Sequence, residues 1–222
     1  MGIFSLFSTL LYRGFLEVIG NSENVRSITP YKSAYNFSNN FIGGENMKRN
    51  LSLWQLTGFA LTALGGTLLH FLFDWTNNSV LVAPFSAVNE STWEHMKLLF
   101  FPMFIFALIE SPFFKEHENF WCVKLVGIIT GVALIPILFY TYNGIFGKSP
   151  DCMNITIFFI SAAASFIVET RLFKQNRLEC KRPWLAFLLI CVIGIMFIIF
   201  TFATPQIPLF KDPLSDLYGL DA

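Results

Sequence analysis

The sequence is poor in charged residues, and the charges that it carries cancel. Only 14% of its 222 residues are Asp, Glu, Lys or Arg, whereas about a quarter of the residues in a typical soluble domain are charged. Fifteen basic and fifteen acidic residues give a formal net charge of zero, and the basic residues are dispersed. These features argue against a soluble globular domain, and we expect no nucleic acid among the partners.

Cysteine is scarce and lacks the spacing of a redox or metal motif. The four cysteines, Cys122, Cys152, Cys180 and Cys191, stand singly and form no CxxC pair. The topology derived below places only Cys152 near the outer face of a membrane, so a disulfide framework is not expected. We therefore expect four thiols that behave as small apolar residues of the core.

What the sequence has in abundance is long hydrophobic runs. Hydrophobic residues make up 54% of the chain, and 27 residues are Phe. A bilayer core is crossed by about 20 apolar residues of helix, and five runs suit this length: 53–74, 96–110, 121–142, 152–173 and 184–203. The second run is short, but a helix that starts near Ser91 and bends at Pro102 is long enough to cross. We predict an all-α fold, a polytopic membrane helix bundle with about five transmembrane helices in the lipid bilayer.

The first 46 residues differ from the remainder of the chain. Residues 2–20 are apolar but contain Arg13 and Glu17, and they lack the charged start and the cleavage site of a signal peptide. One interpretation is a poorly ordered or interfacial extension. The other is that translation begins at Met47. We divide the chain into this extension (1–46), a transmembrane domain (47–204) and a C-terminal strap (205–222).

The distribution of Lys and Arg predicts the orientation in the membrane. Nine such residues flank one side of the predicted bundle: Lys48, Arg49, Lys115, Lys124, Arg171, Lys174, Arg177, Lys181 and Arg182. Only Lys97, Lys148 and Lys211 belong to the other side. Because the side richer in Lys and Arg faces the cytoplasm, we predict a multi-pass protein of the cell membrane. The first core helix then starts in the cytoplasm, and the C-terminus is extracytoplasmic.

Polar residues concentrate where the first predicted helix ends and the second begins. His70 and Asp74 are four residues apart and share one helix face. Ser91 and Glu94 have the spacing of a capping box, in which the hydroxyl and the carboxylate each bind a free backbone N–H. The predicted cluster at the outer face consists of His70, Asp74, Asn89, Glu90, Glu94, His95 and Lys97.

Three interpretations of this cluster remain open. In the first, caps and a Glu94–Lys97 ion pair only hold two helices together. In the second, zinc or a similar divalent metal is bound by the two imidazoles and two carboxylates of His70, Asp74, Glu94 and His95. In the third, the cluster belongs to a proton- or cation-coupled transport site, for which so few helices suggest a homo-oligomer.

The first interpretation has the most support from general patterns, because caps and i,i+3 pairs are common. Our leading functional hypothesis is a metal-assisted or ligand-binding site at the outer face. The alternative is a small transporter or an accessory membrane subunit in which the cluster is purely structural. The sequence contains no HExxH motif and indicates no particular reaction, so catalytic residues and enzymatic activity are left open.

Two further features complete the predicted bundle. Glu110 and Glu169 lie near the ends of the second and fourth hydrophobic runs, on the predicted cytoplasmic side, where ion pairs with Arg171 or Lys124 would resolve their burial. The strap is rich in proline and is expected to run, without a helix, over the outer ends of the first two helices. We expect it to bring Asp212 or Tyr218 to the polar cluster.

Three segments of the sequence resemble one protein family. They are residues 70–75 (HFLFDW), residues 89–102 (NESTWEHMKLLFFP), and the tail motif 207–213 (IPLFKDP) with Tyr218-Gly219. The family is an uncharacterised group of small bacterial integral membrane proteins that is known only as a domain of unknown function. The resemblance covers Met47 to the C-terminus and implies a membrane-embedded fold, but it implies no activity.

Overall fold

The computed structural model describes residues 33–147, 150–175 and 178–221; for residues 33–50 and Asp151 it describes the backbone only. The long helices are α2 (Ser33–Trp75), α3 (Thr92–Glu110), α4 (Phe120–Phe146), α5 (Asp151–Gln175) and α6 (Pro183–Phe202). Short 3-10 turns are η2 (Ser111–Phe113), η3 (Pro208–Phe210) and η4 (Gly219–Asp221). Residues 1–32, the greater part of the predicted extension, lie outside the described residues. Because α2 begins at Ser33, the predicted domain boundary after residue 46 falls inside this helix.

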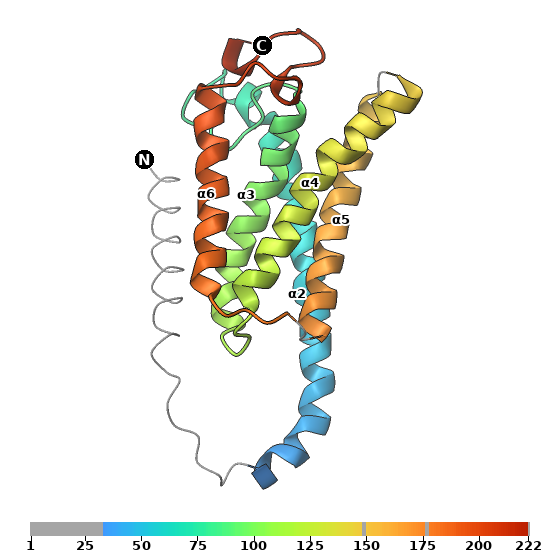
Figure 1. Ribbon diagram of the computed structural model, residues 1–222, viewed down its shortest axis with the longest axis vertical. Coiled ribbons are helices and arrows are strands. Elements are labelled where there is room, and N and C mark those ends of the chain that lie inside the picture. Colours follow the sequence, from blue (N-terminus) through green and yellow to red (C-terminus); the bar gives the residue numbers. More distant parts are fainter. Residues whose placement is uncertain (1–32, 148–149, 176–177, 222) are drawn as a thin grey trace.

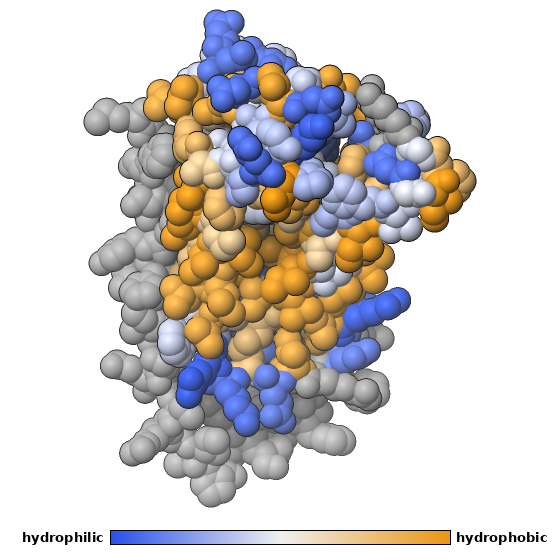
Figure 2. Space-filling view, turned by 45° about the horizontal axis from the view of Figure 1, so that its top comes forward, coloured by the Kyte–Doolittle hydropathy of each residue, from blue (hydrophilic) through white to orange (hydrophobic). Residues whose placement is uncertain are grey.

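The predicted fold class is confirmed by five helical segments that are long and apolar enough to cross a membrane. These segments are Leu51–Trp75, Thr92–Phe113, Phe120–Phe146, Cys152–Gln175 and Pro183–Phe202. On the face shown in Figure 2, hydrophobic side chains form a belt between hydrophilic groups at the two ends. This distribution is typical of a protein whose middle section faces lipid.

Helix α3 is the central helix of the bundle. It contacts α2, α4, α5 and α6, and Figure 1 shows it with α6 on one side and α4 on the other. Its sequence is hydrophobic all round, which is the pattern of a buried helix. The rings of Phe100, Phe101 and Phe104 are among its fully buried side chains. Because α3 is enclosed by its neighbours, polar groups at both of its ends are held against other helices.

The two ends of the bundle are built differently. One end, here called the strap end, carries the 76–91 connection between α2 and α3 together with residues 203–221 (Figure 1). The other, here called the opposite end, carries the connection 114–119 and residues 178–182. Helices α3 and α5 begin at the strap end, whereas α4 and α6 begin at the opposite end.

The strap packs on the start of α3. The ring of Phe210 lies 4.5 Å from the ring of Trp93, and Asn89 Nδ2 donates to the Gly219 carbonyl oxygen at 2.9 Å. The strap is more structured than expected, since it contains η3, η4 and a β-bridge between Lys211 and Tyr218.

Asp212, Lys211 and Asp216 of the strap bind to other residues of the strap. Asp212 accepts hydrogen bonds from the amides of Leu214 and Ser215 and from the Ser215 hydroxyl. Asp212 therefore stabilises its own turn and does not join the polar cluster. Asp216 accepts from Lys211 Nζ at 2.8 Å, and this hydrogen bond raises the pKa of Lys211.

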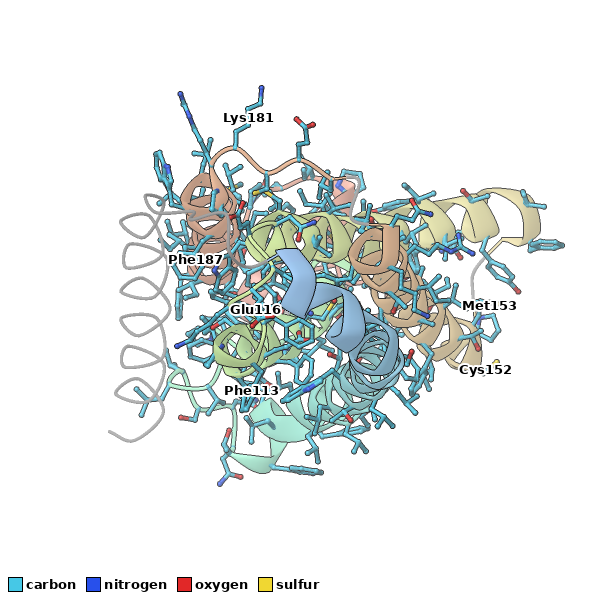
Figure 3. All side chains as sticks on the ribbon, turned by 90° about the horizontal axis from the view of Figure 1, so that it is seen from below. Phe113, Glu116, Cys152, Met153, Lys181 and Phe187 are labelled. Atoms are coloured by element: carbon cyan, nitrogen blue, oxygen red, sulfur yellow. A yellow bond between two sulfur atoms is a disulfide. The ribbon has the colours of Figure 1, made fainter. Side chains whose placement is uncertain are left out.

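The expectation of four free thiols is wrong for one pair. Cys122 in the first turn of α4 and Cys180 in the chain leading to α6 form a disulfide, with a Cα–Cα distance of 6.0 Å. The two cysteines are 58 residues apart, so only the closing of the bundle brings them together. Cys191 is half-buried and free, and Cys152 is free and exposed. Figure 3 shows Cys152 at the rim of the bundle, on the side away from Phe187 of α6.

Candidate functional site

The connection 76–91 is fixed against the end of α2 by one buried hydroxyl. Ser86 Oγ donates to the Leu69 carbonyl oxygen at 2.5 Å and accepts from the Phe73 amide at 2.9 Å. In an uninterrupted α-helix these two backbone groups would bond to each other. Ser86 is thus anchored to the last turns of α2, and the chain that follows it is brought beside His70.

The start of α3 is capped, although not as a complete capping box. Ser91 Oγ accepts from the Glu94 amide at 3.4 Å, as predicted. The Glu94 carboxylate, however, accepts from the Val88 amide at 3.1 Å, while the Ser91 amide donates to Asn89 Oδ1 at 2.9 Å. The capping groups therefore also order the chain from Val88 to Ser91, which contains Glu90.

Glu94 and Lys97 form a buried ion pair at the strap end. Lys97 Nζ lies 2.5 Å from Glu94 Oε2, so the predicted pair is present. Lys97 also donates to the Ala83 carbonyl oxygen at 2.9 Å and to the Thr201 hydroxyl at 3.1 Å. The ammonium group has three donors, and these contacts join α3 to the connection and to α6. The buried Glu94–Lys97 pair therefore connects the start of α3 to the 76–91 connection and to α6.

Three other members of the predicted cluster converge at the surface. Glu90 Oε1 lies 3.4 Å from His70 Nε2, and Glu90 Oε2 lies 3.6 Å from His95 Nε2. One ligand atom from each residue can be chosen so that all three lie within 4.8 Å of one another. The exposed fractions of these side chains are 27% for His70, 39% for Glu90 and 16% for His95. The group is thus held by the protein on one side and open on the other.

The ring of His95 is oriented by the backbone of its own helix. His95 Nδ1 lies 2.9 Å from the Ser91 carbonyl oxygen. Because a carbonyl oxygen only accepts, Nδ1 carries the hydrogen, and the lone pair of the neutral ring is on Nε2. This nitrogen faces Glu90. A histidine whose second nitrogen donates to a carbonyl is the usual arrangement of a metal-binding imidazole.

The structure separates the seven residues of the predicted cluster into different roles. His70 and His95 lie together, and their ring centroids are 5.8 Å apart. Glu90 completes the group, although the predicted ligand set included Asp74 and Glu94 instead. Asp74 is exposed at the end of α2 and stands outside the group. Glu94 does not join His95 in the group, because neighbouring residues on a helix point in different directions. Its carboxylate contacts Lys97 instead.

A second group of charges lies at the opposite end. Lys124 Nζ is 2.5 Å from Glu110 Oε2 and 2.6 Å from Glu169 Oε2. Of the two basic partners proposed for these carboxylates, the structure thus selects Lys124. Arg171 is exposed and does not belong to this group.

These observations define a multi-pass, all-α membrane protein with a His/Glu group at one end of its bundle. Residues 45–220 match the model of a family of unknown function, DUF6512. The chain belongs to this family, and the expectation of a family without an assigned function is confirmed. Comparison with curated proteins found no match, and neither did comparison with solved structures. The geometry of the His70–Glu90–His95 group is therefore the basis for assigning a function.

Proposed function

We propose that this membrane protein binds a divalent, zinc-like metal ion at the strap end through His70, Glu90 and His95. The observation that carries the proposal is the convergence of two imidazole nitrogens and a carboxylate within 4.8 Å. Three separate structural features produce this convergence: the end of α2 supplies His70, the connection supplies Glu90, and the first turns of α3 supply His95.

The spacing of the ligand atoms suits tetrahedral coordination. Zinc–nitrogen bonds of about 2.0 Å at tetrahedral angles place two ligand atoms about 3.3 Å apart. Each carboxylate oxygen of Glu90 lies close to this distance from one histidine nitrogen, Oε1 at 3.4 Å from His70 and Oε2 at 3.6 Å from His95. Two histidines and one glutamate form the ligand set of several catalytic zinc sites, which keep the fourth position for water or substrate.

The exposure of Glu90 favours an open site over a closed structural one. A metal held by these three residues would act as a Lewis acid toward a ligand that enters from the strap end, or it would lower the pKa of a bound water. The protein's own contribution would be to fix two imidazoles and one carboxylate and to leave one position accessible. Binding of a small polar ligand or metal-assisted hydrolysis are the functions that this arrangement supports best.

Metal binding to purified protein tests the proposal. We expect one Co²⁺ or Zn²⁺ ion per chain, and His70→Ala, His95→Ala and Glu90→Gln should each weaken binding more than about 100-fold, beyond the roughly 10–100-fold cost of an outer-shell change. The absorption spectrum of bound Co²⁺ reports its coordination. His117→Ala, at the opposite end, is the matched control and should bind like the wild type. Binding that is absent from the wild type, or equal in all variants, would refute the site.

We further propose that the strap end faces outward, because the opposite end carries most of the flanking Lys and Arg residues. One observation weighs against this orientation: the Cys122–Cys180 disulfide lies at the opposite end, and disulfides are rare in the cytoplasm. In this orientation the pair is expected to be reduced in the cell and to close on exposure to an oxidant.

Labelling of Cys152 decides the orientation. This thiol is exposed at the start of α5, at the strap end. We expect a membrane-impermeant maleimide to modify it in intact cells, and we expect Cys152→Ser to abolish the labelling. Modification only after the membrane is permeabilised would place the strap end inside the cell, and the metal site with it.

A further inference from the structure

Lys124 and its two carboxylates form a completely buried group at the opposite end. Glu110 comes from the last turn of α3, Lys124 from the first turns of α4, and Glu169 from α5. The side chains of Glu110 and Glu169 have no exposed surface, and that of Lys124 is 2% exposed. Both carboxylates contact the same ammonium nitrogen, at 2.5 and 2.6 Å.

Aromatic rings enclose this group. The centroids of Phe106, Phe120, Phe166 and Phe173 lie between 5.6 and 5.9 Å from Lys124 Nζ. Rings at this distance favour a cation and offer nothing to an anion that has no partner. One ammonium and two carboxylates, all ionised, would leave a net charge of −1 in a dry environment. An uncompensated buried charge is costly, and such a group lowers the cost by taking up a proton.

The two carboxyl groups differ in how many of their oxygens have a partner, when ion contacts are counted together with hydrogen bonds. Glu110 uses both oxygens, because Oε2 contacts Lys124 and Oε1 accepts from Gln55 Nε2 at 3.4 Å. Glu169 uses only Oε2, and its Oε1 is buried without a hydrogen-bond partner. Gln55 Oε1 is likewise buried without a partner. Glu169 Oε1 is thus a buried acceptor without a donor, and a hydrogen on this oxygen would turn it into a donor.

We propose that Glu169 is a membrane-embedded proton-binding site, and that it carries one exchangeable proton on Oε1 beside a permanent Lys124–Glu110 ion pair. The proton makes the group electrically neutral and turns Glu169 Oε1, which has no partner as an acceptor, into a hydrogen-bond donor. Uptake adds one H⁺ from water to the carboxylate oxygen, and release returns it; no other bond changes.

The groups that face Glu169 are few. Among the described residues, α3 contributes Glu110, α4 contributes Lys124, and α2 contributes the uncharged Gln55. In the 114–119 connection, the titratable group that reaches these rings is His117, whose ring packs on Phe173 at 5.5 Å. The balance of charge is therefore set within the Glu110–Lys124–Glu169 group itself.

A glycine in α4, Gly127, leaves space for the carboxyl group of Glu169 between α4 and α5. A Cβ atom at Gly127 would lie 2.4 Å from Glu169 Cγ and 2.4 Å from Oε1, closer than such atoms pack. Glycine at this position therefore allows α4 to approach α5 while the carboxyl group stays between them. This close approach accounts for the dry environment on which the proton depends.

Infrared spectroscopy of the full chain in lipid nanodiscs tests the proposal directly. A protonated carboxyl group gives a carbonyl-stretching band that is distinct from carboxylate bands and shifts in D₂O. We expect this band in the wild type at neutral pH and expect it to disappear at alkaline pH. Glu169→Gln should lack the band, and the exposed Glu116→Gln should retain it. Absence of the band from the wild type, or its persistence in Glu169→Gln, would overturn the proposal.

Two further variants separate charge balance from a merely structural role. Glu110→Gln leaves Lys124 with one partner, so Glu169 should ionise and the band should vanish although Glu169 is still present. Lys124→Met removes the cation, so both carboxyl groups should be protonated and the band should grow about twofold. Because Lys124→Met is the variant most at risk of misfolding, the two glutamine variants suffice for the decision. A band that is the same in Glu110→Gln as in the wild type would contradict the proposal.

Discussion

Replacement of Lys97 by methionine is expected to lower the free energy of unfolding by about 3–5 kcal/mol, the usual cost of breaking a buried ion pair from one side. Lys97 is completely buried, and Glu94, its partner at 2.5 Å, is nearly so. Methionine matches the length of the lysine stem but cannot compensate the carboxylate. It also removes the hydrogen bond that the ammonium nitrogen donates to the Ala83 carbonyl oxygen at 2.9 Å. The measurement is reversible unfolding in mixed micelles.

A second substitution shows whether the loss comes from the orphaned charge. In Lys97→Met/Glu94→Gln the uncompensated carboxylate is absent, and an amide oxygen can still accept from Val88. The double variant should therefore be more stable than the sum of the single effects predicts, which is the signature of direct coupling. Lys211→Met is the matched control, because it breaks an ion pair with Asp216 at the surface and should cause no measurable loss.

The same substitution should weaken metal binding. Through Ala83, Lys97 holds the connection that presents Glu90 to the two histidines. If Lys97→Met lowered stability but left Co²⁺ affinity at the wild-type value, the connection would not depend on this anchor. Metal affinity at a temperature where both proteins are folded separates the two effects.

The five helices could be predicted because the bilayer imposes a strong constraint on the chain. Every backbone group must be satisfied within the membrane, so an apolar run of sufficient length becomes a helix. The predicted run 152–173 and the observed segment Cys152–Gln175 begin at the same residue and end within a few residues of each other. Pro102 lies inside α3 without ending it, also as expected.

The residues that form the site were harder to predict from the sequence than the helices. His70 and His95 could be brought together from the order of the helices alone. The choice of Glu90 as the third member depends on the path of the 76–91 connection. That path is set by Ser86, which bonds two backbone groups 13 and 17 residues away. A single serine in a loop carries no signal of this kind, and only the burial of its hydroxyl reveals the role.

The expected free thiols of Cys122 and Cys180 and the expected place of Asp212 in the cluster were wrong for a related reason, although the strap does pack on the start of α3 as predicted. Cys122 and Cys180 meet only because α4 and the chain before α6 converge at the opposite end. Proline content indicated an irregular strap but could not show that Asp212 would bond to the amides of its own turn. Contacts between residues distant in sequence follow from packing, and packing leaves little trace in the local pattern of residues.

A methyl group at Gly66 should disrupt the packing of α2 on α3 and α5. A Cβ atom there would lie 2.4 Å from Phe158 Cζ and 3.0 Å from the carbonyl oxygen of Leu98. The Phe158 ring would have to move, and the carbonyl belongs to a helix backbone, which cannot yield as a side chain does. We expect Gly66→Ala to cost about 1–3 kcal/mol of stability through overpacking. Gly66→Leu should cost more.

Gly144→Ala provides the control for this substitution. Gly144 is also in a helix, but a Cβ atom there would meet nothing within 4 Å. Alanine is the better helix former by about 0.5–1 kcal/mol, so this variant should be as stable as the wild type or more stable. Opposite signs for the same chemical change would show that the cost at Gly66 arises from packing.

The Gly66 variant also connects the packing of α2 to the metal site. His70 lies one turn beyond Gly66 on α2, whereas His95 belongs to α3 and Glu90 to the connection. A displacement of α2 from Leu98 should therefore carry His70 away from both partners, and Co²⁺ affinity should fall together with stability. Unchanged affinity in a clearly destabilised Gly66→Ala protein would mean that the Ser86 bridge alone holds His70 in place.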